Sequence, residues 1–576
     1  MYVVAASTTN WNGTVWWGWG APDAHTPLAE DIRSLLEAAF GVTRRDTPPV
    51  GLDELRLPVA SLSVEASEAL AGVVGPGWVR DDAGSRIRHC RGRSTADLLR
   101  LRAGDALDAP DAVVLPADHD EVLAVLRVCA RQRLAVVPFG GGTSVVGGLA
   151  PARDGFAGVV TLDLGRMDRL TAVDAQSQIV TCEPGLRGPA LEAALAAHGF
   201  TLGHLPQSWE YASVGGFAAT RSSGQASAGY GRFDSLVVGL RIATPAGTWE
   251  LGRAPASAAG PDLRQLVLGS EGAFGVITQV RLRVRPVPET IRYEGWRLAG
   301  FTEGTALLRE LAQRDLLPTV ARLSDEVETA AGLAGGGVGA DGGGCRLITG
   351  YEGRAGWVDT RRAAVAEVLG AAGGVPLGAQ AGAEWVRGRF RGPYLRDALL
   401  DAGMFAETLE TAGFWSTLPD LYARVRDALV AALAAERATE QAGEKAAGQA
   451  AAGRAGERAI DAAGGVPGLV MCHVSHVYPT GASLYFTVVS GQSGQSGQSG
   501  QSGDPVARWR RVKAAASRAI TQTGGTITHH HAIGIDHQPW LTAEIGDLGV
   551  AVLRAVKHTL DPDGILNPGV LVPRAT

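Results

Sequence analysis

The spacing of hydrophobic and polar positions changes along the chain. Between residues 106 and 288, short apolar runs alternate with longer stretches in which apolar and polar residues mix. Short runs bounded by turn residues are typical of buried strands, and the longer stretches are typical of helices. The predicted strands are 112–115, 134–138, 159–164 and 179–183, and the predicted helices are 120–132 and 188–198. Strands that alternate with helices predict an α/β or α+β domain that contains βαβ units.

This pattern divides the chain into four parts. A chain of 576 residues is too long for one core, because domains usually hold about 100–200 residues. We expect a helical lead segment at 1–105, a first domain at 106–288, a second domain of mixed strands and helices at 289–525, and a His-rich loop with a helical segment at 526–576.

Two low-complexity inserts interrupt the second domain. The insert at 432–463 is dominated by alanine, glycine, glutamate and arginine, and we predict a solvent-facing helix that gives way to a linker. The insert at 491–503 repeats Gly-Gln-Ser. Because this repeat has no apolar side chain to bury, we predict a flexible surface loop.

Composition and charge narrow the class of protein. A formal net charge of −6 excludes a general nucleic-acid binder, which would carry a basic excess. The 5 cysteines are scattered without CxxC pairs, which suits a reducing cytoplasm. No apolar stretch approaches the roughly 18–20 residues of a membrane span, and the first residues do not have the pattern of a signal peptide. We therefore expect a soluble bacterial cytoplasmic protein that can still contact a membrane peripherally.

A glycine-rich loop, Pro138-Phe139-Gly140-Gly141-Gly142-Thr143-Ser144, directly follows a predicted strand. Consecutive glycines let the backbone approach a ligand closely and adopt positive φ. Their N–H groups, with the two hydroxyls that follow, can form an anion-binding nest for a diphosphate. A tight turn is the alternative for an isolated glycine triplet. The loop is neither a Walker loop nor a dinucleotide fingerprint, because it has no Gly-Lys-Ser/Thr and no GxGxxG that opens a helix.

Three further segments follow the glycine loop in order. They are Gln207-Ser208-Trp209-Glu210-Tyr211-Ala212-Ser213, Thr220-Arg221-Ser222-Ser223, and Glu271-Gly272-Ala273-Phe274-Gly275-Val276-Ile277. Together the four motifs resemble the FAD-binding domain of the vanillyl-alcohol-oxidase superfamily. The resemblance implies that these segments bind FAD. It also implies an α+β fold, with a PCMH-type FAD-binding domain of two subdomains, an α/β cap domain with an antiparallel sheet, and a C-terminal helical segment.

The position just before the glycine loop bears on how FAD is held. In that superfamily, FAD is sometimes tethered to a histidine there. Pro138 and Phe139 occupy the place in this chain. We therefore expect FAD to bind non-covalently.

The second candidate for chemistry is His529-His530-His531. In an extended segment alternate side chains face opposite ways, so we expect His529 and His531 on one side and His530 on the other. Such a cluster can bind an anionic group and relay protons near neutral pH, whereas a solvated run of histidines would do neither. A metal site that adds a histidine at 473, 476 or 537 is an alternative. No carboxylate or cysteine is spaced to complete it, so we predict no metal.

Beyond the FAD motifs, the chain resembles the alkyldihydroxyacetonephosphate synthase (alkylglycerone-phosphate synthase) family. The resemblance runs from Trp17-Gly18-Trp19-Gly20 to the end, without the two inserts. Further matching stretches are Gly203-His204, Glu407-Thr408-Leu409-Glu410-Thr411, Ser475-His476-Val477-Tyr478 and Gln538-Pro539-Trp540-Leu541.

The resemblance implies roles for six residues of the second domain and the His-rich loop. Tyr485 would be the catalytic acid/base, and His529, His530 and His531 would be required for activity. Arg396, in a Tyr-x-Arg-Asp stretch, would contact substrate, and Arg322 matches another family arginine near the flavin.

The implied reaction replaces the acyl chain of acyl-dihydroxyacetone phosphate with a long-chain fatty alcohol. It forms the ether bond of ether lipids through a flavin N5 adduct, with no net redox change. Arg396 and the histidines would be the cations that stabilise the Tyr485 phenolate and hold the substrate phosphate. An apolar tunnel would house the alkyl chain. We also expect a homodimer and no nucleic-acid partner.

A FAD-linked 2-hydroxy acid dehydrogenase or oxidase, of the D-lactate or glycolate type, is the competing interpretation. It shares the FAD domain and much of the cap. Its C-terminal loop usually reads Glu-His-Gly-Ile-Gly, where this chain has His530-His531-Ala532-Ile533-Gly534. The stretches around Tyr485 and Arg396 favour the synthase. One departure from the synthase pattern is Ala532, where the family has glycine.

Overall fold

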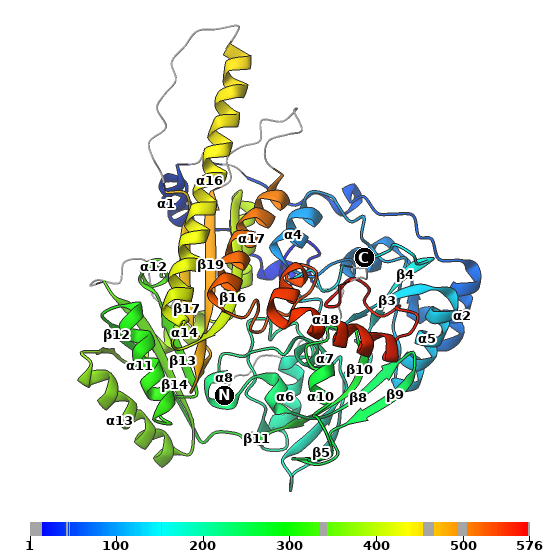
Figure 1. Ribbon diagram of the computed structural model, residues 1–576, viewed down its shortest axis with the longest axis horizontal. Coiled ribbons are helices and arrows are strands. Elements are labelled where there is room, and N and C mark those ends of the chain that lie inside the picture. Colours follow the sequence, from blue (N-terminus) through cyan, green and yellow to red (C-terminus); the bar gives the residue numbers. More distant parts are fainter. Residues whose placement is uncertain are drawn as a thin grey trace.

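The computed structural model describes residues 14–573, apart from 42–43, 45, 151, 333–342, 453–465 and 492–503; the side chains of 440–452 also lie outside the description. The end of the first insert and nearly all of the Gly-Gln-Ser repeat therefore lie outside the described residues. The chain forms two halves that face each other (Figure 1). One half contains a four-stranded, a five-stranded and a two-stranded sheet, and the other contains a large antiparallel sheet, so the α+β expectation is confirmed.

The lead segment spreads over both halves. Its helices are α1 (Glu30–Phe40), α2 (Val64–Val74), α3 (Ala83–Arg88) and α4 (Thr95–Arg102), with short 3-10 turns at Pro22–Ala24, Leu52–Glu54 and Pro76–Trp78. Leu70 of α2 packs in the core of the half with the smaller sheets. Phe40 of α1 packs against Met404 and Val489 of the large sheet. The lead segment thus joins the two halves.

A four-stranded sheet begins the first half. Its order is β1 (Val79–Arg80), β2 (Ala112–Val114), β4 (Gly158–Asp163) and β3 (Leu134–Phe139). Strands β2, β4 and β3 run parallel and are buried almost throughout, which explains their continuous apolar sequences. Helix α5 (His119–Gln132) provides the crossover, and the Asp118 side chain caps it by accepting the N–H groups of Asp120 and Glu121.

A five-stranded antiparallel sheet completes the first half. Its order is β5 (Leu170–Asp174), β6 (Ile179–Cys182), β10 (Val276–Arg283), β8 (Val237–Thr244) and β9 (Gly247–Leu251). The helices in this part of the chain are α6 (Gly188–Ala196), α7 (Val214–Thr220), α8 (Ser227–Tyr230), α9 (Phe233–Leu236) and α10 (Arg264–Val267). Leu191 of α6 and Phe217 of α7 belong to the core of the five-stranded sheet. Two short strands, β7 (Phe200–Thr201) and β11 (Arg285–Pro286), pair with each other.

The large sheet of the second half has strictly antiparallel neighbours. Its order is β15 (Val375–Leu377), β12 (Thr290–Leu298), β14 (Cys345–Gly353), β13 (Val320–Ser324), β17 (Leu469–Val474), β19 (Gly481–Gly491) and β16 (Met404–Phe414), with β18 (Val477–Tyr478) beside β19. Alternation along the strands separates two faces. Leu347 belongs to the main core of this half, whereas Ile348 packs with Trp385 on the other face.

Helices cover one face of the large sheet, as Figure 1 shows. They are α11 (Phe301–Gln313), α13 (Ala355–Ala371), α16 (Leu418–Ala452) and α17 (Pro505–Thr523). Their buried residues, such as Leu308, Leu421 and Val512, share one core with the strands. The shorter helices are α12 (Glu326–Ala330), α14 (Gly378–Gly388) and α15 (Gly392–Asp401). The opposite face of the sheet, on which α14 packs through Trp385, meets the first half.

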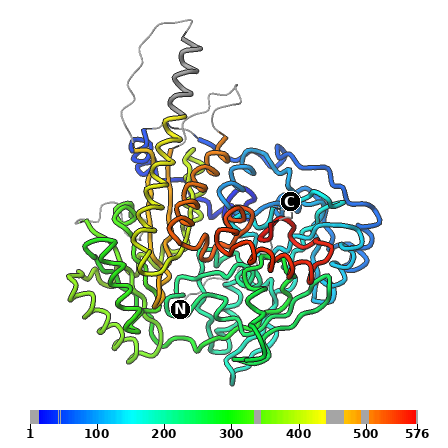
Figure 2. Tube along the Cα trace, viewed as in Figure 1, coloured from blue at the N-terminus to red at the C-terminus, as the bar shows by residue number. Residues whose placement is uncertain are grey.

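After α17 the chain returns to the first half, as Figure 2 shows in orange and red. A loop leads to a 3-10 turn (Gln538–Trp540) and to α18 (Leu541–Leu560). Beyond α18, Leu566 pairs with Val136 of β3, and Val570 packs against Phe274. The His-rich loop is therefore fixed between the two halves.

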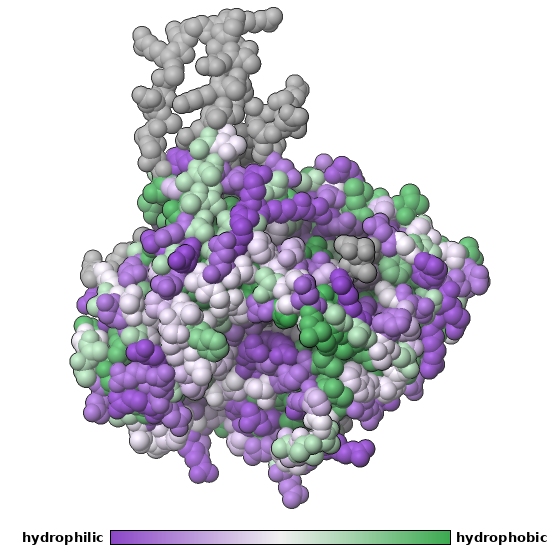
Figure 3. All heavy atoms as spheres, viewed as in Figure 1, coloured by the Kyte–Doolittle hydropathy of each residue, from purple (hydrophilic) through white to green (hydrophobic). Residues whose placement is uncertain are grey.

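The surface over α18 is apolar in Figure 3. Ile545, Leu548 and Val552 are exposed there and recur at helical spacing, with Leu548 80% exposed. Among the described residues, none of the helices combines the length and the apolar character needed to cross a bilayer.

Candidate active site

A cavity of about 580 Å³ lies between this second face of the large sheet and the first half. All four sequence motifs predicted to bind FAD contribute to its lining, and so do residues of the second half. We call the first group the cradle; its lining members are Pro138, Phe139, Gly140, Gly141, Gly142, Thr143, Ser144, Gln207, Ser208, Ala212, Ser213, Thr220, Ser222, Ser223, Glu271, Gly272, Gly275 and Ile277. We call the second group the cap wall; it comprises Arg322, Arg396, Tyr485, His530 and His531.

The other predicted residues lie behind the cavity wall. Trp209 stacks on Phe390 with ring centroids 5.5 Å apart, and Tyr211 meets Trp19 edge-on at 5.4 Å. Arg221 donates to the backbone carbonyls of Leu268 and Gln265. The remaining members are Glu210, which accepts a hydrogen bond from Tyr394, the buried Ala273, Phe274 and Val276, and His529.

Close packing explains the three consecutive glycines of the cradle, Gly140, Gly141 and Gly142. A Cβ on Gly141 would lie 2.2 Å from the carbonyl oxygen of Tyr211, and one on Gly140 would lie 2.3 Å from Oγ of Ser213. Gly142 also has a φ of +66°, in the region that favours glycine. The loop at 140–142 therefore lies so close to the 211–213 segment that there is no room for a side chain between them.

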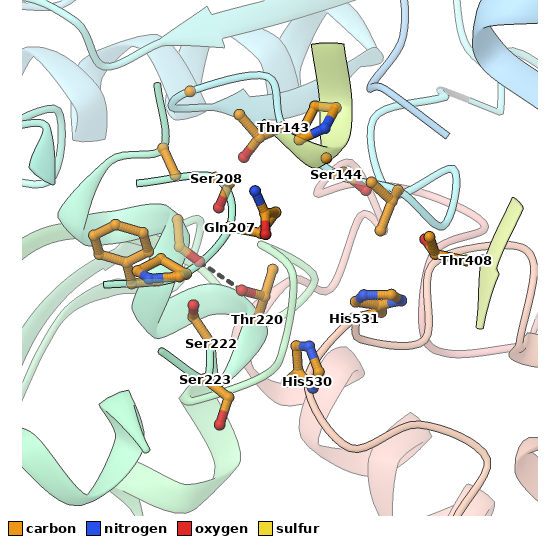
Figure 4. Close-up of a pocket in the computed structure, with 18 of the residues that line it drawn as sticks. Thr143, Ser144, Gln207, Ser208, Thr220, Ser222, Ser223, Thr408, His530 and His531 are labelled. Atoms are coloured by element: carbon orange, nitrogen blue, oxygen red, sulfur yellow. Dashed lines mark hydrogen bonds between the residues drawn. The ribbon is translucent and has the colours of Figure 1, made fainter. Parts of the chain in front are cut away.

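Apart from Glu271, the cradle presents neutral hydrogen-bonding groups to the cavity. Figure 4 shows the hydroxyls of Thr143, Ser144 and Ser208 around it, with Ser222 and Ser223 on a neighbouring segment. The buried Oγ of Ser223 has no hydrogen-bond partner in the described part of the chain. Backbone N–H groups and small hydroxyls suit the diphosphate and sugar of a dinucleotide. The cradle thus fits the FAD that the sequence predicts.

The cap wall is organised by a buried glutamate on β16. The carboxylate of Glu410 accepts the backbone N–H groups of His529, His530 and His531 at 2.6, 3.1 and 2.9 Å, and it also accepts the Thr528 hydroxyl. Burial alone would raise the pKa of Glu410, but the adjacent histidines hold that pKa well below its usual range. One ionised carboxylate therefore fixes the whole His-rich segment.

This geometry corrects the expected orientation of the histidines. His530 and His531 both line the cavity (Figure 4), whereas His529 is not part of its lining and bonds to Tyr478. The expectation that His529 and His531 would share one side is wrong. Three consecutive N–H groups converge on one carboxylate, which an extended segment with alternating N–H directions does not allow.

Two opposed effects act on the charge of the histidines. Burial is the main cause that lowers the pKa of His530 and holds that of His531 well below its usual range. Burial also lowers the pKa of His529 to about 3. Burial therefore favours the neutral form of the three rings, whereas the Glu410 carboxylate favours the charged form, and the role of the histidines as cations stays a prediction. The permanent positive charge in the cap wall belongs to its two arginines.

Tyr485 occupies the centre of the wall because of strand register. It pairs with Glu410 on one side and with His473 on the other. Its ring stacks on that of His473 at 4.8 Å and meets His531 edge-on at 5.6 Å. Burial raises the pKa of Tyr485 to about 12, whereas Arg322 acts to lower it. The phenol is thus protonated at rest.

Both arginines of the cap wall have structural partners. Arg322 donates to Glu328 at 2.9 Å, and the pKa of Glu328 falls to about 2 despite burial, because Arg322 and His473 lie beside it. Arg396 donates to the carbonyl oxygen of Arg93 at 2.7 Å and pairs with Asp397 at 3.2 Å. Each side chain is oriented toward the cavity by these contacts.

The sequence motifs did not assign roles to Glu410, His476 and Tyr478, although all three stand in stretches quoted for the family resemblance. His476, His529 and His530 have ring nitrogens within 4.8 Å of one another, close enough for a metal ion. Both ring nitrogens of His529 already bond, to Tyr478 at 2.7 Å and to His530 at 3.0 Å. We keep the prediction that no metal is held there.

Comparisons with known proteins agree with this geometry. Residues 110–251 match the family described as FAD binding domain, and residues 287–571 match FAD linked oxidases, C-terminal domain. The chain is 30% identical to alkyldihydroxyacetonephosphate synthase of Dictyostelium discoideum over 92% of its own length and 84% of the relative. It is 29% identical to the Trypanosoma brucei brucei protein of that name over the same shares. A solved alkyldihydroxyacetonephosphate synthase structure superposes with a TM-score of 0.76 at 26% identity, covering 97% of this chain and 99% of the other.

Proposed function

Because the chain belongs to the alkyldihydroxyacetonephosphate synthase family of FAD-dependent enzymes, we propose that it exchanges the acyl chain of acyl-dihydroxyacetone phosphate for a long-chain fatty alcohol. The observation that carries the proposal is the cap wall. Tyr485, two arginines and two histidines face the FAD cradle across one cavity. An acid/base group and anion-binding groups are what the exchange of an ester for an ether on a phosphorylated substrate requires.

FAD is the cofactor of this enzyme. We propose that the backbone N–H groups of 140–144 and the hydroxyls of Thr143 and Ser144 hold its diphosphate. Bound FAD supplies an electron-rich centre at which the oxygen substituents of the reacting carbon exchange without net oxidation. The absence of histidine at positions 138 and 139 supports non-covalent binding.

Tyr485 is proposed to remove and return a proton at the reacting carbon. Its high pKa keeps it protonated at rest, so it needs a nearby positive charge when it acts as a base. Arg322 is the neighbouring cation that favours the phenolate. The sequence analysis gave the stabilisation of the Tyr485 phenolate to Arg396 and the histidines. We now propose Arg322 for this role.

Arg396, His530 and His531 are proposed to hold the substrate phosphate. The guanidinium provides a permanent charge, and each neutral imidazole provides one N–H donor. A bound phosphate would also raise the pKa of both histidines, because an adjacent anion favours the protonated ring. The phosphate thereby creates part of the charge that binds it.

Peripheral membrane contact is part of the proposal, and the apolar surface of α18 supports it. Leu548 and Val552 are exposed on a protein whose proposed substrates are lipids. Replacing both by serine should lower the fraction of enzyme that floats with phospholipid vesicles several-fold and leave turnover of detergent-dispersed substrate unchanged. Equal flotation would remove α18 from membrane contact. The proposed homodimer is tested by light scattering, where a monomer mass would contradict it.

The direct test of the function is an anaerobic incubation with acyl-dihydroxyacetone phosphate and labelled hexadecanol. The expected products are a labelled ether and free fatty acid in equal amounts. Dihydroxyacetone phosphate without an acyl chain provides the control, because it lacks the leaving group. An enzyme that contains FAD but forms no ether in this assay would contradict the proposed function.

A further inference from the structure

The proposed reaction releases one proton, that of the alcohol hydroxyl, in each turnover. The bond between the reacting carbon and the acyl oxygen breaks, and the bond between that carbon and the alcohol oxygen forms. No electron is gained or lost overall. The fatty acid leaves as a carboxylate, because a carboxylic acid with an ordinary pKa of about 4 is ionised at neutral pH. The proton of the alcohol hydroxyl belongs to neither product and must leave a buried site.

A chain of hydrogen-bonding side chains leads from the cavity toward the surface. His530 lines the cavity, and its Nδ1 lies 3.0 Å from Nδ1 of His529. Nε2 of His529 lies 2.7 Å from the hydroxyl oxygen of Tyr478. Tyr478 is only partly buried, and the next two residues, Pro479 and Thr480, are exposed. The three side chains therefore form a continuous series of contacts from the cavity to the partly exposed Tyr478, which precedes the exposed turn between β18 and β19.

The contact between the Nδ1 atoms of His529 and His530 allows two arrangements of protons on the rings. A hydrogen bond forms there only if one nitrogen carries a proton and the other does not. In one arrangement Tyr478 donates to His529, His529 donates to His530, and the proton of His530 lies on Nε2, toward the cavity. In the other arrangement every bond is reversed and Tyr478 donates to water. A proton that arrives at Nε2 of His530 converts the second arrangement into the first and expels a different proton from Tyr478.

We propose that Tyr478, His529 and His530 form a proton relay that carries the alcohol proton from the cavity to solvent. The inference rests on the proposed function, because the proton it moves is the hydroxyl proton of the fatty alcohol. Within it, Tyr478 is a relay residue that does not touch the substrate.

The charged groups around the relay keep its middle ring neutral. Glu410 of β16 binds the backbone N–H of His529, and Arg232 donates to the carbonyl oxygen of the same residue at 3.0 Å while pairing with Asp234. The ring of His476 stacks on that of His529 at 5.1 Å. Burial first, and then the neighbouring histidine and Arg232, lower the pKa of His529 to about 3. A proton therefore passes through this ring without resting on it.

The test replaces Tyr478 by phenylalanine, which removes the outer hydroxyl and keeps the ring. We expect kcat for ether formation to fall by about tenfold or more, in the range of a lost acid–base group, with KM for acyl-dihydroxyacetone phosphate within about twofold. Imidazole added to the buffer should restore turnover in proportion to its concentration, because it carries protons by diffusion. The effect of D₂O on kcat should be larger in the variant than in the wild type.

Tyr422→Phe is the matched control, because it also removes one tyrosine hydroxyl, which bonds to Asp325 at 3.2 Å outside the cavity. Its turnover should be unchanged and insensitive to imidazole. If Tyr478→Phe loses FAD or unfolds, His529→Gln provides the second interruption and should show the same imidazole rescue. Wild-type turnover in Tyr478→Phe, or a loss that imidazole does not restore in either variant, would overturn the relay. A wild-type enzyme that forms no ether would overturn the proposed function and the relay with it.

Discussion

The cradle and the cap wall are built by opposite means, although they face the same cavity. The cradle is made mainly of backbone and uncharged side chains from short local motifs, such as the glycines at 140–142, with Glu271 as its one titratable member. The cap wall is made of buried titratable side chains, such as Tyr485 and His530, which strands and a loop from distant parts of the sequence bring together. The cradle is suited to hold a cofactor in one position, whereas the cap wall is suited to move protons. Changes in the two regions should therefore have separable effects.

The largest expected effect concerns the cradle. Acid precipitation of the purified yellow protein should release all of its flavin as intact FAD, because Pro138 and Phe139 stand where a tethering histidine would be. Absorbance of the supernatant and of the pellet measures the two fractions. Flavin that stays with the precipitated protein would contradict non-covalent binding.

The next effect concerns the centre of the cap wall. Tyr485→Phe should lower ether formation by about 10²–10⁴-fold, the usual contribution of an acid–base group, and should leave FAD bound. The ratio of flavin to protein absorbance provides the control for the cradle. Activity within twofold of the wild type would remove Tyr485 from the chemistry.

Phosphate binding should depend on the cap wall alone. Changing His530 and His531 together to alanine should weaken binding of acyl-dihydroxyacetone phosphate at least tenfold, because each hydrogen bond to a charged group contributes about 1.5–3 kcal/mol. Binding is measured by titration of the flavin spectrum. Unchanged affinity would show that the histidines do not contact the phosphate.

The carboxylate of Glu410, which holds the histidines of the cap wall, should also contribute to the free energy of unfolding. Glu410→Gln turns an acceptor into a donor opposite backbone N–H groups, so we expect a loss of about 2–4 kcal/mol in the free energy of unfolding by urea. Glu436→Gln, which loses a pair with the largely exposed Arg511, should cost less than about 1 kcal/mol.

The Glu410 effect should also depend on pH in a definite direction. The folded pKa lies below the unfolded one, so the stabilising effect is fully present above about pH 4.3 and is lost as pH falls toward the folded pKa. The difference between wild type and Glu410→Gln should therefore shrink on acidification. A difference that grows on acidification, or equal costs for both glutamines, would contradict the assigned role.

The smallest effect concerns the departure from the family pattern at Ala532. Its φ is +75°, a region in which a side chain costs about 1–2 kcal/mol. Ala532→Gly should therefore stabilise the protein by about 1 kcal/mol. Ala555→Gly, in the exposed part of α18, should destabilise it by about the same amount, because glycine is unfavourable within a helix. Two changes of the same sign would contradict this explanation.

The same contrast explains what the sequence could predict. The lining members of the cradle come from four contiguous motifs, whose glycines and hydroxyls show their function locally. Trp209 and Phe274 lie behind the wall because a motif does not indicate which of its side chains face inward. The charge and direction of His529–His531 could not be predicted, since both depend on Glu410, more than a hundred residues away in the sequence. The contact between Tyr478 and His529 forms only when β18 and the His-rich loop are folded, so the sequence could not predict it.

The most direct measurement follows the flavin spectrum by stopped flow under anaerobic conditions. The enzyme is mixed separately with acyl-dihydroxyacetone phosphate, with D-lactate and with glycolate. We predict a spectral change with acyl-dihydroxyacetone phosphate and no rapid bleaching of the long-wavelength flavin band with either 2-hydroxy acid, because the proposed exchange involves no net redox change. Fast bleaching by a 2-hydroxy acid, with no response to acyl-dihydroxyacetone phosphate, would contradict the account and assign the enzyme to the FAD-linked dehydrogenases.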